Sequence, residues 1–172
     1  MRLLAGRANE RCTLETYPLR HRLTIVKLGD QLRFKHILQN DTVSCGPACI
    51  AMLAGVSLET AAAEIDRHSN GKTDWAQMRV ALRTFGLEHS GRPKRVADWA
   101  KIPAVALVAC SRVASGDWHW VIFDRFDGLI YDPLAKNGPR RFDVGNVRHP
   151  ISYLTVHRTK EEIGVARGAG RG

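Results

Sequence analysis

The sequence predicts an α+β fold, with N-terminal helices packed on a mainly antiparallel sheet. Helical patterns fill residues 45–86 and strand patterns begin only after residue 100, and this separation is typical of the α+β class. The chain has 172 residues, enough for one buried core, and neither a repeat nor a break in composition marks a second domain. We therefore expect one domain over residues 23–157, after an irregular extension at 1–22 and before a basic tail at 158–172 that we expect to be disordered.

The first elements expected along the chain are a hairpin and a buried helix. Two short apolar segments, 23–26 and 32–35, flank a Gly-Asp pair, which favours a turn between two strands. Residues 45–53 are almost wholly apolar, and a helix that is apolar on all sides is a buried one. Pro47 is tolerated because it lies in the first turn, and Gly55 is expected to end the helix.

Two further helices are expected before the sheet begins. Ser57 is a favourable N-cap for a helix over residues 58–65. A third helix is expected to begin at residue 73 or 74 and to stop at Gly86, because its apolar residues recur every three or four positions.

Strand patterns dominate the second half of the chain. Residues 104–109 form a continuous apolar run that suits a central strand. Residues 118–123 and 129–131 are two more expected strands, joined by a turn that contains an Asp-Gly pair. Residues 153–156 are expected to complete the sheet.

Composition and charge exclude several classes of protein. Hydrophobic residues make up 44% of the chain and charged residues 25%, as in an ordinary globular protein. The apolar runs are too short to cross a bilayer, and the basic start of the chain does not resemble a signal peptide, so we expect no membrane partner. The net charge is +9, but the Lys and Arg residues are scattered, and no nucleic-acid-binding motif is present. A nucleic-acid partner is therefore not expected, whereas an acidic peptide or protein substrate is consistent with the charge.

The cysteine content favours a cytoplasmic protein with free thiols. The four cysteines are Cys12, Cys45, Cys49 and Cys110, and they form neither a Cys-x-x-Cys pair nor a secreted disulfide framework. A zinc site built from Cys45, Cys49 and His119 is disfavoured, because two cysteines four apart in a buried helix match no common zinc module. We expect no metal and no cofactor. The oligomeric state is left open.

Cys45 is the candidate nucleophile. It stands at the start of the expected buried helix, where unpaired backbone N–H groups favour a thiolate over a thiol. Gly46 would let a substrate backbone approach closely. Cys49 and Cys110 lie inside apolar segments and fit the ordinary role of a small core residue.

Three other residues complete a candidate catalytic group. His119 lies near the start of a strand that otherwise belongs to the core, so it is either hydrogen-bonded in the interior or directed into a cleft. Asp132 follows the next strand and could accept the imidazole N–H, although an Asp-Pro pair is also a common turn. Gln39 lies six residues before Cys45, and its amide could donate to an oxyanion together with the Cys45 backbone N–H.

The ordered combination of these motifs resembles the C39 peptidases and C39-like proteins, a branch of the papain-like cysteine peptidases. The similar segments are Gln39–Cys49, with a Gln six positions before a Cys-Gly pair, Trp118–Ile122 around the histidine, and the Asp-Pro pair at Asp132. The resemblance spans about residues 36–143. It implies a papain-like fold, with Cys45 as nucleophile, His119 as general base and acid, Asp132 as the orienting carboxylate, and Gln39 as oxyanion donor.

The resemblance also implies a function. We expect a thiol protease, a hydrolase that cleaves peptide or isopeptide bonds, and the same site could serve acyl transfer. The alternative is a catalytically silent C39-like domain that binds peptides or partner proteins. The best-known members are fused to a membrane exporter and trim double-glycine leader peptides; no exporter is present in this sequence, so that substrate is not carried over. The sequence departs from the transporter-borne members at Ser44, where they often have an acidic residue, and Trp120 beside His119 is expected to narrow the cleft.

Overall fold

The computed structural model describes residues 33–66, 69–111, 118–143 and 148–158. The expected extension at 1–22, the first strand of the expected hairpin and the tail after residue 158 lie outside these residues. Residues 33–35 form bends and irregular backbone. The prediction of a second hairpin strand is therefore wrong over these residues. No helix in the described residues has both the length and the apolar character needed to cross a bilayer.

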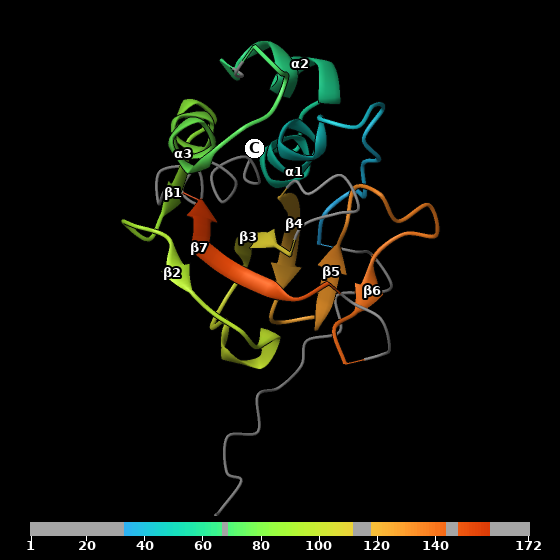
Figure 1. The fold of residues 1–172 in the computed structure, drawn as a ribbon, viewed down its shortest axis with the longest axis vertical. Helices are drawn as coiled ribbons and strands as arrows, with labels where there is room; N and C mark the ends of the chain where they lie inside the picture. The colour runs from blue at the N-terminus through green and yellow to red at the C-terminus, as the bar shows by residue number, and fades with distance from the viewer. Residues whose placement is uncertain (1–32, 67–68, 112–117, 144–147, 159–172) are drawn as a thin grey trace, which may run out of the picture. The chain divides into compact units, whose positions relative to one another are not determined.

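In the part of the chain that the structure describes, three α-helices precede the sheet and gather on one side of it (Figure 1). They are α1 (Cys45–Ala54), α2 (Leu58–Ala63) and α3 (Trp75–Thr84). A short 3-10 helix, Trp99–Lys101, follows later. The positions and order of the three helices agree with the expectations from the sequence, although α2 is two residues shorter than expected.

Local signals in the sequence account for the ends of these helices. Gly55 adopts a left-handed conformation (φ 73°) after α1, which a residue without Cβ does at little cost. The Ser57 hydroxyl accepts the Thr60 N–H at the start of α2. Asp74 and Gln77 form a reciprocal capping box at the start of α3, so two N–H groups that lack intrahelical partners are satisfied.

Within the described residues the sheet has seven strands, and every pairing between them is antiparallel. The strands are β1 (Leu87–His89), β2 (Lys94–Arg95), β3 (Ala106–Cys110), β4 (His119–Asp124), β5 (Leu129–Tyr131), β6 (Arg140–Arg141) and β7 (Pro150–Arg158). Their order is β1-β7-β3-β4-β5-β6, and β2 also pairs with β7. Helices thus come first and an antiparallel sheet follows, which confirms the α+β class.

The two faces of the sheet bury separate apolar clusters. On the helix side, Cys49 and Leu53 of α1 pack in one cluster with Trp120 and Ile122 of β4. On the opposite side, residues of alternate parity on the same strands pack against Trp99. The central strands β3 and β4 are therefore buried on both faces, which explains why they are almost continuously apolar in the sequence.

The sequence patterns missed the shortest elements. Strands β2 and β6 have two residues each and both are exposed, so neither carries an apolar alternation. Strand β7 is longer than expected because it pairs with β1, β2 and β3 and so continues through residues that are not apolar.

Candidate active site

The candidate nucleophile, Cys45, is the first residue of α1 and is 7% exposed. Ser44, the N-cap, does not cap the helix with its side chain. Its hydroxyl donates to Asn40 Oδ1 (3.0 Å) instead. The first N–H groups of a helix have no acceptor within the helix, and Pro47 has no N–H group. The N–H groups that the first turn of α1 can offer to an external acceptor are therefore those of Cys45 and Gly46.

The loop that leads into Cys45 is held by one carboxylate. Asp41 Oδ1 accepts the N–H groups of Val43 (2.8 Å) and Ser44 (2.7 Å). This arrangement is an Asx turn, which fixes the chain direction just before the helix begins. The candidate nucleophile is therefore positioned by two local features, a turn and a helix start, that lie within five residues of it.

Gly46 is required for a reason that the sequence did not reveal. A Cβ at this position would collide with Thr73 Oγ1 and would lie 3.1 Å from Met78 Sδ. Gly46 therefore allows the segment before α3 to pack directly against the start of α1. The close approach that the structure shows is to this protein's own Thr73, and the expected approach of a substrate backbone stays a prediction.

His119 and Asp132 are brought together by the pairing of neighbouring strands. His119 is the first residue of β4 and is 2% exposed, and Asp132 directly follows β5. Because β4 pairs with β5, the His119 Nε2 and Asp132 Oδ1 atoms lie 2.6 Å apart. This contact is a charge-assisted hydrogen bond when the imidazole is protonated.

The electrostatics of this pair favour an ionised state. Burial lowers the pKa of His119, but hydrogen bonds to Asp132 and to the Cys45 side chain, together with their charges, outweigh it and raise the pKa above its ordinary value. Burial likewise raises the pKa of Asp132, whereas the hydrogen bond and charge of His119 lower it, and the net direction is down. Cys45, His119 and Asp132 thus form one connected group.

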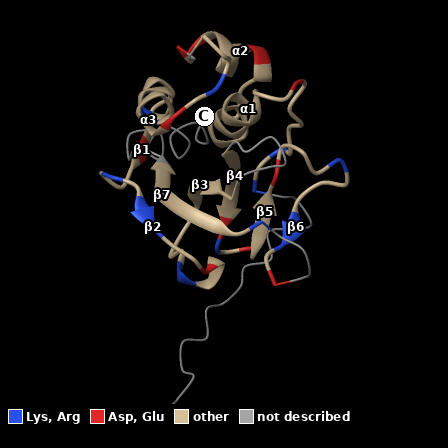
Figure 2. Ribbon diagram, viewed as in Figure 1, with Lys and Arg blue, Asp and Glu red and all other residues tan. Residues whose placement is uncertain are grey.

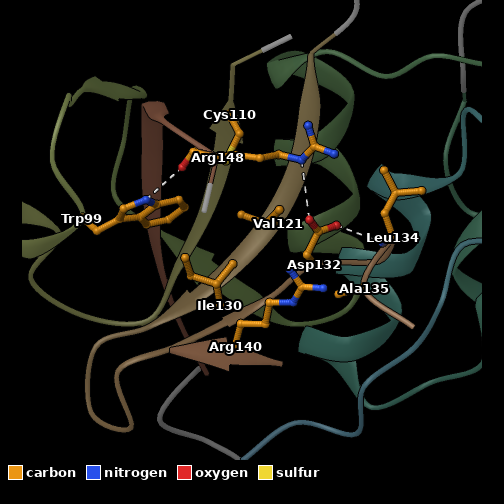
Figure 3. Close-up of a pocket in the computed structure, with 9 residues that line it drawn as sticks. All are labelled: Trp99, Cys110, Val121, Ile130, Asp132, Leu134, Ala135, Arg140 and Arg148. Carbon is orange, nitrogen blue, oxygen red and sulfur yellow. Dashed lines mark hydrogen bonds and ion pairs between the residues drawn. The ribbon is translucent and has the colours of Figure 1, made fainter. Parts of the chain in front are cut away.

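Asp132 has two further partners that hold its carboxylate in place. Its Oδ1 accepts the Leu134 N–H (2.8 Å). On the other side, Arg148 Nε lies 3.5 Å from Asp132 Oδ2 (Figure 3). The backbone oxygen of Arg148 accepts the indole N–H of Trp99 (2.9 Å), which anchors the arginine (Figure 3). Arg148 is 16 positions away from Asp132 in the chain, and no motif indicated the contact.

Gln39 lies on the loop before Cys45, but its side chain is engaged locally. Its Nε2 donates to the Asp41 backbone oxygen (2.5 Å), and its Oε1 is buried without a hydrogen-bond partner in the described part of the chain. An amide nitrogen has two N–H groups, so one is left for another acceptor. The Gln39 backbone N–H donates to the Pro133 oxygen (3.0 Å), and His36 Nε2 donates to the Asp132 oxygen (2.9 Å). These two bonds join the Gln39 loop to the segment that carries Asp132.

The other two described cysteines, Cys49 and Cys110, are fully enclosed in the core. Cys49 is fully buried, and burial followed by the nearby charges of Cys45 and Asp132 raises the pKa of its thiol well above the usual value. Burial raises the pKa of Cys110 in the same way. Both thiols are therefore protonated and enclosed at neutral pH. Within the described residues, no group of three or more His, Cys, Asp or Glu side chains is arranged to hold a metal ion.

A narrow hollow lies beside Cys45. Its volume is about 90 Å³, and its walls include Thr73, Trp118 and Trp120. Trp120 thus lines the hollow beside the candidate nucleophile, whereas its expected effect on the space beside His119 stays a prediction. A larger cavity of about 420 Å³ is lined by Asp132 together with Trp99, Arg140 and Arg148 (Figure 3). Cys45 and His119 are not part of its wall.

Comparison with solved structures defines the class of fold. The chain is similar to a double-glycine motif protease from an AMS/PCAT transporter, solved in complex with the leader peptide, with 21% identity and a TM-score of 0.56 over 74% of this chain and 93% of that chain. It is also similar to the peptidase domain of Streptococcus ComA, a bifunctional ABC transporter involved in quorum sensing, with 17% identity and a TM-score of 0.54 over 72% and 97% of the two chains. The fold is therefore C39-like, within the papain-like class. No family model and no curated protein matches the sequence.

Proposed function

We propose that this protein is a thiol-dependent hydrolase of peptide or isopeptide bonds. The observation that carries the proposal is the connected group of Cys45, His119 and Asp132, in which a thiol at a helix N-terminus lies beside a buried imidazole that a carboxylate orients. The C39-like fold supports the same reading, because both similar structures are peptidase domains.

The proposed reaction begins with transfer of the Cys45 proton to His119. Asp132 holds the Nε2 edge of the ring, so Nδ1 is the nitrogen that exchanges the proton with sulfur. The thiolate attacks the substrate carbonyl carbon and forms a tetrahedral oxyanion. His119 then gives its proton to the leaving amine, and the C–N bond breaks to leave a thioester on Cys45.

Hydrolysis of the thioester restores the starting state. A water molecule gives one proton to His119 as its oxygen attacks the carbonyl carbon, and the thiolate leaves as the carboxylic acid product forms. We assign the Cys45 backbone N–H and one Gln39 amide N–H as donors to the oxyanion in both steps. The unused Gln39 N–H group and the uncapped start of α1 support this assignment.

We infer that the substrate is a peptide or protein. One similar structure holds a leader peptide, which supports this class. The hollow of about 90 Å³ beside Cys45 favours small side chains close to the scissile bond. We also propose a cytoplasmic location, because the described cysteines are free thiols, as in proteins of reducing compartments.

Two measurements on matched variants test the proposal. Iodoacetamide at pH 6 should alkylate Cys45 and spare Cys49 and Cys110, as read by mass spectrometry. A diverse peptide library should be cleaved by the wild type and by Cys12→Ser but left intact by Cys45→Ala. If Cys45 reacts but no peptide is cleaved, the silent, peptide-binding alternative is favoured. If Cys45→Ala cleaves as well as the wild type, the proposal is wrong.

A further inference from the structure

A groove leads away from Cys45 along three adjoining hollows. The first is the hollow of about 90 Å³ beside the nucleophile. It shares Thr73, Trp118 and Trp120 with a second hollow of about 250 Å³. The second shares Trp75, Trp118 and Ser152 with a third hollow of about 780 Å³. The shared walls make the three hollows one path, narrow at Cys45 and wide at its far end.

The walls of this groove are held rigidly by aromatic packing. The rings of Trp75 and Trp120 meet edge to face with centroids 4.5 Å apart. The Trp75 indole N–H donates to Ser152 Oγ (3.2 Å), which ties α3 to β7 across the groove. Trp118 is 50% exposed and lines all three hollows. A ligand that enters the groove therefore meets flat apolar surfaces that are already in place.

The wide end of the groove is strongly basic. Arg79 of α3, Arg92 and Arg95 line it, and no Asp or Glu lies in its described wall. Figure 2 shows the Lys and Arg residues of β2 and of the loop before it on this edge of the sheet. In the described part of the chain, none of the three guanidinium groups forms an ion pair with a carboxylate. Asp74 lines only the middle hollow, where its Oδ1 caps α3.

One of these arginines has a donor that lacks a partner. Arg79 Nε is buried and has no hydrogen-bond acceptor among the described residues. A buried donor without a partner is costly, and a guanidinium group binds carboxylates through paired N–H groups. Three guanidinium groups around one wide hollow favour the binding of carboxylate side chains. A substrate peptide whose scissile bond lies at Cys45 could place such side chains in this hollow.

We propose that Arg79, Arg92 and Arg95 form a subsite for Asp or Glu side chains of the substrate. The substrate is thus a peptide with small residues at the scissile bond and acidic residues a few positions away on one side. This inference rests on the proposed function for the placement of the scissile bond. Binding at the basic subsite does not require catalysis, so it can be measured with an inactive variant.

The test uses the full chain with Cys45→Ala, so that no probe is cleaved. The probes are a fluorescein-labelled peptide of alternating Gly and Glu, its Gly and Gln counterpart, and a single-stranded oligonucleotide of equal charge. Fluorescence anisotropy should give a dissociation constant for the Glu peptide at least about tenfold lower than for the Gln peptide. Adding Arg92→Gln and Arg95→Gln should remove this preference.

A matched control separates the subsite from net charge. Arg125→Gln with Lys136→Gln removes two charges from exposed positions outside the groove and should leave the preference unchanged. Arg92→Glu with Arg95→Glu should reverse the preference toward a Gly and Lys peptide, and both sites are exposed, so folding should be retained. Arg79→Gln tests the third arginine, with its melting temperature measured alongside.

Three results would overturn the inference. The first is equal binding of the Glu and Gln peptides. The second is an equal loss of binding in the groove variant and the control variant. The third is tighter, Arg92- and Arg95-dependent binding of the oligonucleotide, which would assign the groove to nucleic acid. Failure of the proposed function is a separate result, because it is read from Cys45 alkylation and peptide cleavage in the wild type.

Discussion

His119 Nε2 lies 2.6 Å from Asp132 Oδ1, and this one contact joins the start of strand β4 to the end of β5 at the candidate active site. The contact stabilises the imidazolium form, so the pKa of His119 is raised although burial alone would lower it. If the active form pairs the Cys45 thiolate with the His119 imidazolium, activity is lost as the pH rises through the pKa of His119.

The first prediction concerns the carboxylate. In Asp132→Asn the pKa of His119 should fall, because the neutral amide no longer stabilises the imidazolium. The alkaline limb of kcat/KM should therefore move to lower pH by about one unit or more. An unchanged alkaline limb would show that the Asp132 carboxylate does not raise the pKa of His119.

The second prediction concerns Arg148, whose replacement should shift the pH–rate profile in the opposite direction. Arg148 Nε lies 3.5 Å from Asp132 Oδ2 and is one cause of the lowered pKa of Asp132. Arg148→Met removes a cation, so the pKa values of both Asp132 and His119 should rise and the whole pH–rate profile should move to higher pH. The shift should be less than about one unit, because the Arg148 side chain is 32% exposed.

The control for Arg148 is Lys101→Gln, an exposed cation on the 3-10 helix, which should not move the profile. A fall in kcat at every pH without a shift of either limb would mean that the Arg148 side chain acts through packing and not through charge.

The third prediction concerns Gln39. If its amide stabilises only the tetrahedral state, Gln39→Ala should lower kcat and kcat/KM together and leave KM almost unchanged. The expected loss is about 10²–10³-fold, or about 2.7–4 kcal/mol in the barrier. Alkylation of Cys45 by iodoacetamide should be much less affected, because displacement at a saturated carbon forms no oxyanion.

A structural role for Gln39 predicts another outcome. Its bond to the Asp41 oxygen would then dominate, and the melting temperature, turnover and alkylation would fall together. If Gln39→Ala equals the wild type in kcat, another group donates to the oxyanion.

The fourth prediction tests the contact between the segment before α3 and Gly46, which follows the candidate nucleophile. Gly46→Ala places a methyl group against Thr73 and Met78 and should lower the free energy of unfolding by about 1–3 kcal/mol, measured by urea denaturation. Gly91→Ala is the control, because a Cβ there meets nothing within 4 Å. Adding Thr73→Ala should restore part of the stability lost in Gly46→Ala. If Gly46→Ala is as stable as Gly91→Ala, the close packing is not required.

Much of the fold was predictable because its signals are local. Ser57, Asp74 and Gly55 end or begin helices through bonds and backbone conformations that involve residues no more than a few positions away. The apolar runs of β3 and β4 indicate burial on both faces. The two-residue strands β2 and β6 carry no such signal, because they exist only by pairing with β7 and β5.

Some residues of the candidate site could likewise be predicted from the sequence, and others could not. Cys45 could be singled out from its place at a helix start, and the spacing of Gln39, His119 and Asp132 made a recognisable pattern with it. Arg148, Thr73 and Trp75 could not be assigned to the site, since their contacts depend on how separate elements pack. Gly46 was identified, but the partner that requires it was not.

The sequence alone determined the positions of the helices and central strands and predicted which residues are candidates for the chemistry, because helix starts, caps and apolar periodicity depend on neighbouring residues. The tertiary structure decided their partners and the shape of the groove. The register of β4 on β5 sets the distance from His119 to Asp132, and the packing of α3 on α1 and β7 places Trp75 beside Trp120 and Ser152. These relations join residues from 13 to 77 positions apart, and burial of the two apolar clusters fixes them only when the chain has folded.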